Sequence, residues 1–121
     1  MATSVILPTT KSVESFGGGW YGYRMDDGYK VAWKLFEYTA DITTASTDYG
    51  GYRTNGKGVN IPDGLFTDAD SMIVLGELNA FGGVRLSGIR ADSTTKITFY
   101  LTKATSLSGY ACKLSILVIG K

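Results

Sequence analysis

The chain has 121 residues, of which 44% are hydrophobic and 19% charged, which is typical of one folded domain and excludes an intrinsically disordered chain. The formal net charge is only +1, so electrostatics favours neither nucleic acid nor an anionic membrane as a partner. The chain contains no histidine and a single cysteine, which excludes Ser-His and Cys-His catalytic arrangements, an internal disulfide and a zinc site built from cysteines.

The first 18 residues are expected to be a lead-in segment or linker, and residues 19–121 the folded domain. The lead-in holds a possible short strand at residues 5–7 and a glycine run at residues 17–19, expected to be a flexible joint. The N-terminus lacks the basic start and apolar centre of a signal peptide, and no apolar run approaches the ~20 residues of a membrane span. We therefore expect synthesis in the cytoplasm without membrane insertion.

Residues 20–38, WYGYRMDDGYKVAWKLFEY, predict an aromatic β-hairpin. Asp27 and Gly28 shape its turn, because glycine supplies the positive φ angle that a tight turn needs. In the second arm, apolar residues occupy every second position around Trp33, the period of a half-buried strand. We expect Trp20 and Trp33, one on each arm, to anchor the hydrophobic core.

Turn signals divide the rest of the chain into short strands. The expected strands cover residues 42–44, 71–78, 84–89, 96–103 and 110–120, with a helical turn at 65–69. The apolar run at 71–78 is expected to be buried on both faces. Together with the hairpin, these segments make about seven to eight strands. They predict an all-β fold, an antiparallel, jelly-roll-like β-sandwich.

The last strand is apolar on both faces. Cys112 and every second residue after it form the expected core-facing set, in which the thiol is buried and inert. Ala111, Leu117 and Ile119 lie on the opposite face. Either this face meets a partner subunit, or the strand is central in its sheet and covered by a loop.

The loop expected at residues 47–58, TDYGGYRTNGKG, carries candidate ligand-binding side chains. The candidates are Tyr49, Tyr52 and Arg53, with Tyr38 of the hairpin as a fourth. Aromatic and guanidinium groups provide stacking surface and planar hydrogen bonding, and recognition residues gather on loops. The alternative is that these tyrosines only cover an edge of the sandwich.

Two pairs of carboxylates are the remaining groups that could carry chemistry. Asp26 and Asp27 are adjacent in a turn and do not converge on a substrate as glycosidase acids do. Asp68 and Asp70 start like a calcium-binding loop, but the third acidic residue, the glycine and the terminal glutamate are missing. We therefore predict no catalytic residues, no metal and no cofactor.

The aromatic stretch from Trp20 to Gly28, followed by Trp33, resembles the aromatic, Ser-Asp-Gly and Trp opening of the C-terminal domains of phage tail-fibre and tail structural proteins. IPDGLF at residues 61–66 is similar to the Pro and Phe element of that family. The final VIGK is similar to its end, without the Arg-Trp pair.

The resemblance implies a virion protein, a β-sandwich at the tip of a tail fibre or baseplate, usually a homotrimer. Such tips contact host-surface glycans or proteins and other tail proteins, and the family pattern marks no catalytic residues. Two further functions stay open: a purely structural virion or baseplate module, and a sugar-binding protein similar to the H-type lectins. The resemblance carries over structural roles only, for Trp20, Trp33, Asp27 and Gly28.

Overall fold

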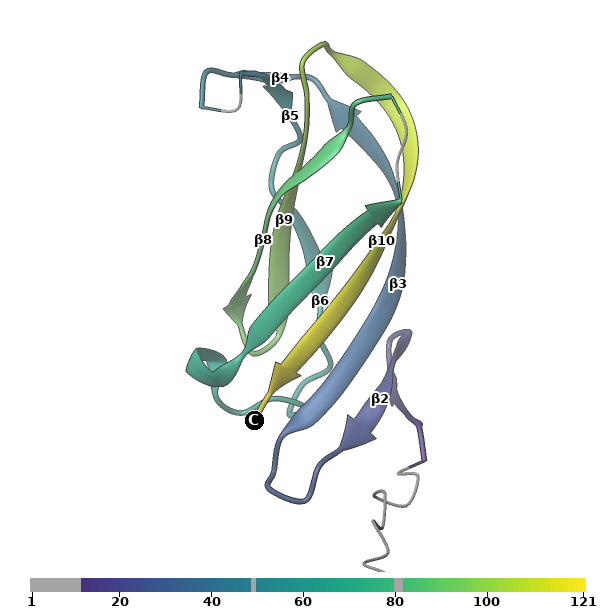
Figure 1. The fold of residues 1–121 in the computed structure, drawn as a ribbon, viewed down its shortest axis with the longest axis vertical. Helices are drawn as coiled ribbons and strands as arrows, with labels where there is room; N and C mark the ends of the chain where they lie inside the picture. Colours follow the sequence, from purple (N-terminus) through teal and green to yellow (C-terminus); the bar gives the residue numbers. More distant parts are fainter. Residues whose placement is uncertain (1–11, 49, 80–81) are drawn as a thin grey trace, which may run out of the picture.

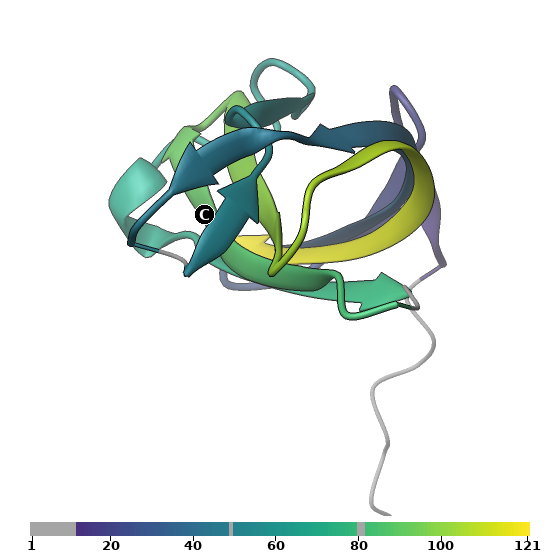
Figure 2. The same cartoon turned by 90° about the horizontal axis from the view of Figure 1, so that it is seen from above.

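The computed structural model describes residues 12–48, 50–79 and 82–121, whose regular structure is strand apart from one short 3-10 turn. All strand pairs are antiparallel and form two stacked sheets (Figure 1; Figure 2). The all-β, jelly-roll-like antiparallel sandwich is confirmed, but the described residues hold ten strands rather than seven or eight. The elements are β1 Glu14–Gly17, β2 Trp20–Arg24, β3 Lys30–Ile42, β4 Thr44–Ser46, β5 Gly51–Arg53, β6 Lys57–Asn60, the 3-10 turn η1 Ala69–Ser71, β7 Ile73–Asn79, β8 Arg85–Ser93, β9 Lys96–Lys103 and β10 Leu107–Gly120.

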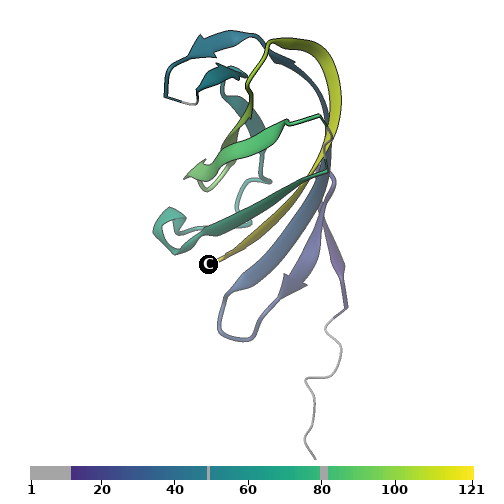
Figure 3. The same cartoon turned by 45° about the horizontal axis from the view of Figure 1, so that its top comes forward.

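The first sheet, sheet A, has the strand order β1-β2-β3-β10-β7, and the second, sheet B, is centred on β9. Strand β8 pairs with one edge of β9, while β5 and β6 follow one another along its other edge, with β4 beyond β5. Thr54 bridges β5 and β6: its N–H donates to the carbonyl oxygen of Leu101 at 3.0 Å, and its hydroxyl accepts the Leu101 N–H at 3.0 Å. Figure 3 shows how β3 and β10 curve along their length.

Side chains at alternate positions of the central strands fill the core, because successive residues of a strand point to opposite faces. Trp20 is fully buried, and its indole N–H donates to the carbonyl oxygen of Asn60 at 2.8 Å, which ties sheet A to sheet B. The alternation predicted for the two strands nearest the C-terminus is confirmed, with the buried residues Ile97, Phe99, Leu101, Cys112, Leu114, Ile116 and Val118.

The predicted hairpin is formed by β2 and β3, and β3 continues to Ile42, so the strand expected at 42–44 is divided between β3 and β4. Three hydrogen bonds hold the turn, one of them from the N–H of Gly28 to the carbonyl oxygen of Met25 at 3.3 Å. The N–H of Met25 donates to the carbonyl oxygen of Tyr29 at 2.7 Å, and the N–H of Tyr29 donates to the Asp27 carboxylate at 3.1 Å. Gly28 has φ 88°, a conformation that glycine adopts at little cost.

Trp33 does not face the core, contrary to the expectation that both tryptophans anchor it. It lies opposite Tyr21 on the outer face of sheet A, half-buried, with its ring 6.1 Å from that of Tyr23 in an edge-to-face arrangement. The inward position beside it is Ala32, which is fully buried and pairs with Gly22 of β2. In β3 both sets of alternate residues are partly apolar. Alternation alone therefore does not show which set faces the core.

The start of the domain also differs from the expected boundary at residue 19. Strand β1 pairs with β2, so the sandwich includes residues from Glu14 onward. The glycine run at residues 17–19 is the tight turn between these strands and not a joint, since each glycine has a positive φ, 89°, 60° and 82°. The strand expected at residues 5–7 lies outside the described residues.

Three further expectations are corrected by the structure. Strand β7 is an edge strand with one face open, since Ile73 and Leu75 are 58% and 56% exposed, and it is not buried on both faces. The helical turn is η1 and not residues 65–69. Strand β8 continues to Ser93, through residues expected to form a turn. No helix among the described residues is long and apolar enough to cross a membrane.

Candidate functional site

The outer face of sheet B is polar and is built around Tyr100. The neighbouring β9 residues Phe99 and Leu101 point into the core, so Thr98, Tyr100 and Thr102 point outward. Strands β5 and β6 on one side of β9, and β8 on the other, complete this face. The candidate site therefore combines the consecutive strands β8 and β9 with β5 and β6, which come from an earlier part of the chain.

Two glycines flank the Tyr100 ring and give it an open surface. A Cβ atom at Gly56 would lie 3.0 Å from the Tyr100 hydroxyl oxygen, so this glycine allows the ring to approach β6 closely. Gly88 pairs with Tyr100 from β8, and a Cβ atom there would meet nothing within 4 Å. The β8 side of the ring is therefore accessible to a flat ligand.

Arg53 stacks on the same ring. Its guanidinium carbon lies 5.6 Å from the centroid of the Tyr100 ring, within cation–π range, and its Nη1 donates to the carbonyl oxygen of Thr54 at 3.0 Å. These two contacts hold the guanidinium group in place beside the ring. A planar, pre-oriented guanidinium group is suited to hydroxyl and carboxylate oxygens, which it can bind through two N–H groups at once.

Arg85 lies across β9 from Arg53, since both residues pair with Thr102. Arg85 is exposed and borders a shallow depression of about 360 Å³ that Thr102 and Lys103 also line. Among the residues that the structure describes, neither Arg53 nor Arg85 has a carboxylate within ion-pairing distance. This end of the face thus carries positive charge that is not neutralised locally.

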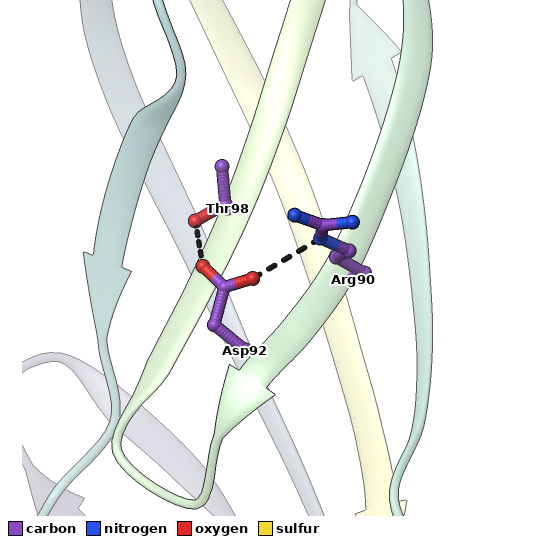
Figure 4. A network of polar contacts seen from close by, with 3 residues as sticks. All are labelled: Arg90, Asp92 and Thr98. Atoms are coloured by element: carbon purple, nitrogen blue, oxygen red, sulfur yellow. Dashed lines mark hydrogen bonds and ion pairs between the residues drawn. The ribbon is translucent and has the colours of Figure 1, made fainter.

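A polar network lies at the other end of the face (Figure 4). The Asp92 carboxylate accepts a hydrogen bond from the Thr98 hydroxyl and another from Arg90 Nε at 3.1 Å. The Thr98 hydrogen bond, followed by the hydrogen bond and charge of Arg90, lowers the pKa of Asp92 below its usual value. Asp92 therefore stays ionised at neutral pH and acts as an acceptor that orients its two neighbours.

Of the four side chains proposed from the sequence, only Arg53 lies on this face. Tyr49 is outside the described residues. Tyr52 faces inward and packs against the core, because the expected loop is in fact the strands β5 and β6. Tyr38 also faces inward, with its ring 5.9 Å from that of Phe36 in a stacked arrangement, and burial is the main cause that raises its pKa.

Sequence reasoning missed Tyr100 as a site residue. The signal was present, because the alternation in residues 96–103 already separates Thr98, Tyr100 and Thr102 from the core-facing set. What the sequence did not show is that Arg53 of β5, Gly56 before β6 and Gly88 of β8 lie beside this tyrosine. Contacts between strands of distant sequence position depend on the register of the sheet.

The remaining candidate groups have structural roles. The Asp68 carboxylate accepts the N–H of Asp70 at 3.1 Å and so caps η1. The Cys112 thiol is buried, donates to the carbonyl oxygen of Tyr38 at 3.3 Å, and has its pKa raised by burial. Within the described part of the chain, no three His, Cys, Asp or Glu side chains gather where they could hold a metal ion.

The geometry of the outer face of sheet B is that of a shallow binding surface with an aromatic ring, fixed hydrogen-bond donors and positive charge. Comparisons with protein-family models, with curated proteins and with solved structures find no match for this chain.

Proposed function

We propose that this chain is a receptor-binding domain at the tip of a phage or prophage tail, and that it binds host-surface carbohydrate as a homotrimer. The resemblance of the Trp20 hairpin to tail-fibre domains supports the class of protein. The observation that carries the binding role is the stack of Arg53 on Tyr100, on the polar outer face of sheet B. The outer face of sheet B, and not the tyrosine-rich loop expected at residues 47–58, is therefore the candidate binding site.

The chemistry of the face suits a sugar. One face of a pyranose ring is apolar and packs on an aromatic ring, here on the side of Tyr100 that Gly88 leaves open. The equatorial hydroxyl groups, or a carboxylate on an acidic sugar, would meet the guanidinium groups of Arg53 and Arg85. Hydrogen bonds to charged groups contribute roughly 1.5–3 kcal/mol each, so a single open site of this kind binds weakly. Several copies of the site would then supply the strength that one lacks.

The proposal is for binding and not for catalysis. Asp92 is the one carboxylate in the strands that form sheet B, and Arg90 and Thr98 hold it ionised. A carboxyl group with a lowered pKa is a poor proton donor at neutral pH, so it does not suit the general acid of a glycosidase. As a fixed acceptor it can instead receive a sugar hydroxyl.

The test is binding of the purified chain to a glycan array and to cell-wall preparations of candidate hosts. Tyr100→Ala and Arg53→Ala should each weaken binding at least tenfold. The matched controls Tyr29→Ala and Arg24→Ala, in the hairpin of sheet A, should bind like the wild type. Circular dichroism and thermal unfolding verify that each variant is folded. Equal binding by wild type, Tyr100→Ala and Arg53→Ala would remove the site from this face.

A purely structural tail module is the second candidate function, favoured by the apolar residues exposed on the outer face of sheet A. The same assay separates the two. A wild-type chain that binds no glycan and no cell wall, yet associates with itself or with other tail proteins, would support the structural role.

A further inference from the structure

Positive charge is concentrated on one of the two sheets. The strands of sheet B, over the residues that the structure describes, carry six lysine and arginine side chains against one acidic side chain, that of Asp92. The six are Arg53, Lys57, Arg85, Arg90, Lys96 and Lys103. The whole chain holds twelve such basic residues and eleven acidic ones, so the remainder has six and ten. A net charge near zero for the chain therefore conceals a basic sheet B, which attracts ligands of negative charge.

Arg53 and Arg85 form a pair on the outer face of sheet B. Both pair with Thr102, so their Cα atoms lie two strand spacings apart, about 10 Å. Long side chains that start at this separation can meet over Thr102. Arg53 leans toward Tyr100, with its guanidinium carbon 5.6 Å from the ring centroid, and donates one N–H group to the carbonyl oxygen of Thr54. A guanidinium group has more N–H donors than this one bond uses, so it can also donate to a ligand beside the ring.

Two hydroxyl groups lie between these arginines. The register of β8 against β9 shifts between Leu86 and Gly88, and the extra residue, Ser87, forms a hydrogen bond with the Thr102 hydroxyl. A bulge of this kind redirects a side chain and is frequent beside binding sites. Each hydroxyl has one hydrogen, and one bond between them leaves the other hydrogen for a ligand oxygen. Donors without a competing carboxylate therefore gather at the edge of the depression that Arg85 and Thr102 line.

The one carboxylate of sheet B is too distant to neutralise this pair. Asp92 accepts a hydrogen bond from Thr98, which precedes Thr102 by four residues of β9, or about 13 Å along the strand. The Debye length at physiological ionic strength is about 8 Å, so the field of Asp92 is largely screened at that distance. Asp92 repels an anion only at its own end of the face. An anionic ligand is thereby directed to the end that carries Arg53 and Arg85.

We infer that the surface between Arg53 and Arg85 binds an oxyanion, a carboxylate or a phosphate group, carried by a sugar whose ring packs on Tyr100. The inference rests on the proposed carbohydrate binding and narrows its ligand to acidic saccharides. Tyr100 is the one aromatic side chain that the described strands of sheet B turn outward, since Tyr52 and Phe99 face the core. A single ring suits one sugar, whereas surfaces for single-stranded nucleic acids stack successive bases on several rings. An acidic saccharide is thus a better match than a polynucleotide of the same charge.

The experiment is binding of the purified chain to oligosaccharides printed in pairs: uronic-acid oligosaccharides with their carboxyl-reduced forms, and sugar phosphates with their dephosphorylated forms. The wild type should bind the acidic member of at least one pair about tenfold or more tightly than its neutral partner, because hydrogen bonds between charged groups are the stronger ones. The two kinds of pair show whether the anion is a carboxylate or a phosphate. Arg85→Gln should remove the preference and bind the neutral partner as the wild type does, within about twofold. Arg24→Gln removes the same charge from an ion pair with Glu14 in sheet A and should leave the preference unchanged, and circular dichroism verifies that both variants are folded.

Equal affinity of the wild type for the acidic and neutral members of every pair overturns the inference, and so does an unchanged preference in Arg85→Gln. Tighter binding of a single-stranded oligonucleotide than of every acidic saccharide also overturns it. Failure of the proposed function has a different result. A wild type that binds acidic and neutral saccharides alike, through Tyr100, keeps the carbohydrate role and contradicts only this inference, whereas a wild type that binds no saccharide contradicts both.

Discussion

At the scale of single residues, the two tryptophans have similar surroundings in the sequence and different surroundings in the fold. Trp20 is fully buried between the sheets and donates to the carbonyl oxygen of Asn60, whereas Trp33 is half-buried on the outer face of sheet A. Trp20→Ala should therefore lower the free energy of unfolding by about 3–5 kcal/mol, through the cavity that it leaves. Trp33→Ala should cost about 1–2 kcal/mol, because part of its surface is already exposed.

Urea denaturation measures both values. A Trp33→Ala variant as destabilised as Trp20→Ala would contradict the placement of Trp33 on the outer face.

Asp92 offers a second prediction at this scale, because its hydrogen bond from Thr98 and its contacts with Arg90 lower its pKa. A lowered pKa means that the contribution to stability is complete above the unfolded value of about 3.9 and is lost as pH falls through the folded value. Carboxyl carbon chemical shifts should show Asp92 titrating below the usual range. Thr98→Val should raise its pKa toward the usual value, whereas Thr105→Val, a change in an exposed turn, should not. An unchanged pKa in Thr98→Val would show that the network is not formed in solution.

At the scale of elements, two glycines of the hairpin predict different costs for the same substitution. Gly28 has φ 88° in the turn with open space around it, so Gly28→Ala meets only backbone strain of about 1–3 kcal/mol. A Cβ atom at Gly22 in β2 would lie 1.9 Å from the carbonyl oxygen of Val31, and backbone atoms cannot yield as a side chain can. Gly22→Ala should separate β2 from β3 and be the more damaging change. Thermal unfolding gives the order, and the reverse order would contradict the pairing of these strands.

The sequence predicts an element well when only one of its faces is apolar. In β9 the apolar residues alternate with threonines and Tyr100, so both its limits and its inward face follow from the pattern. In β3 and β7 both alternating sets are apolar, so the pattern shows a strand but not which face is buried. Strands β5 and β6 are short and rich in glycine, and their sequence resembles a loop. Tyr52 was placed on the surface for that reason.

The candidate site was predictable only in part, for a related reason. Arg53 was found because arginine next to tyrosines is a recognisable composition. Its partner Tyr100 is 47 positions away, a separation like the one that joins Thr54 to Leu101. Side chains on one face of a sheet become neighbours through strand register, which local patterns do not encode.

At the scale of the whole molecule, the two outer faces of the sandwich differ in character: that of sheet A exposes apolar side chains, whereas that of sheet B is polar and carries Tyr100. The faces of a sandwich point in opposite directions, since each sheet turns its inner face to the common core. A homotrimer joined through the exposed apolar side chains of sheet A would leave the Tyr100 surface of sheet B exposed in every copy. In such an assembly the proposed site would act in several copies at once without any change in its own geometry.

The separation also predicts how an association-deficient variant should bind. Linking several sites raises the apparent affinity for a repeating surface by about 10²–10⁴, whereas affinity for one free sugar does not depend on the number of copies. Leu75→Lys places a charge among the exposed apolar side chains of sheet A and should disrupt the proposed homotrimer. It should thus bind a soluble oligosaccharide as the wild type does, within about twofold, but bind a glycan-coated surface at least 100-fold more weakly. Isothermal calorimetry and surface plasmon resonance measure the two quantities. A binding site confined to the outer face of sheet B should keep its affinity for the free sugar in a single chain. If Leu75→Lys also lost binding to the free sugar, the site would have to include residues of sheet A or of a second copy.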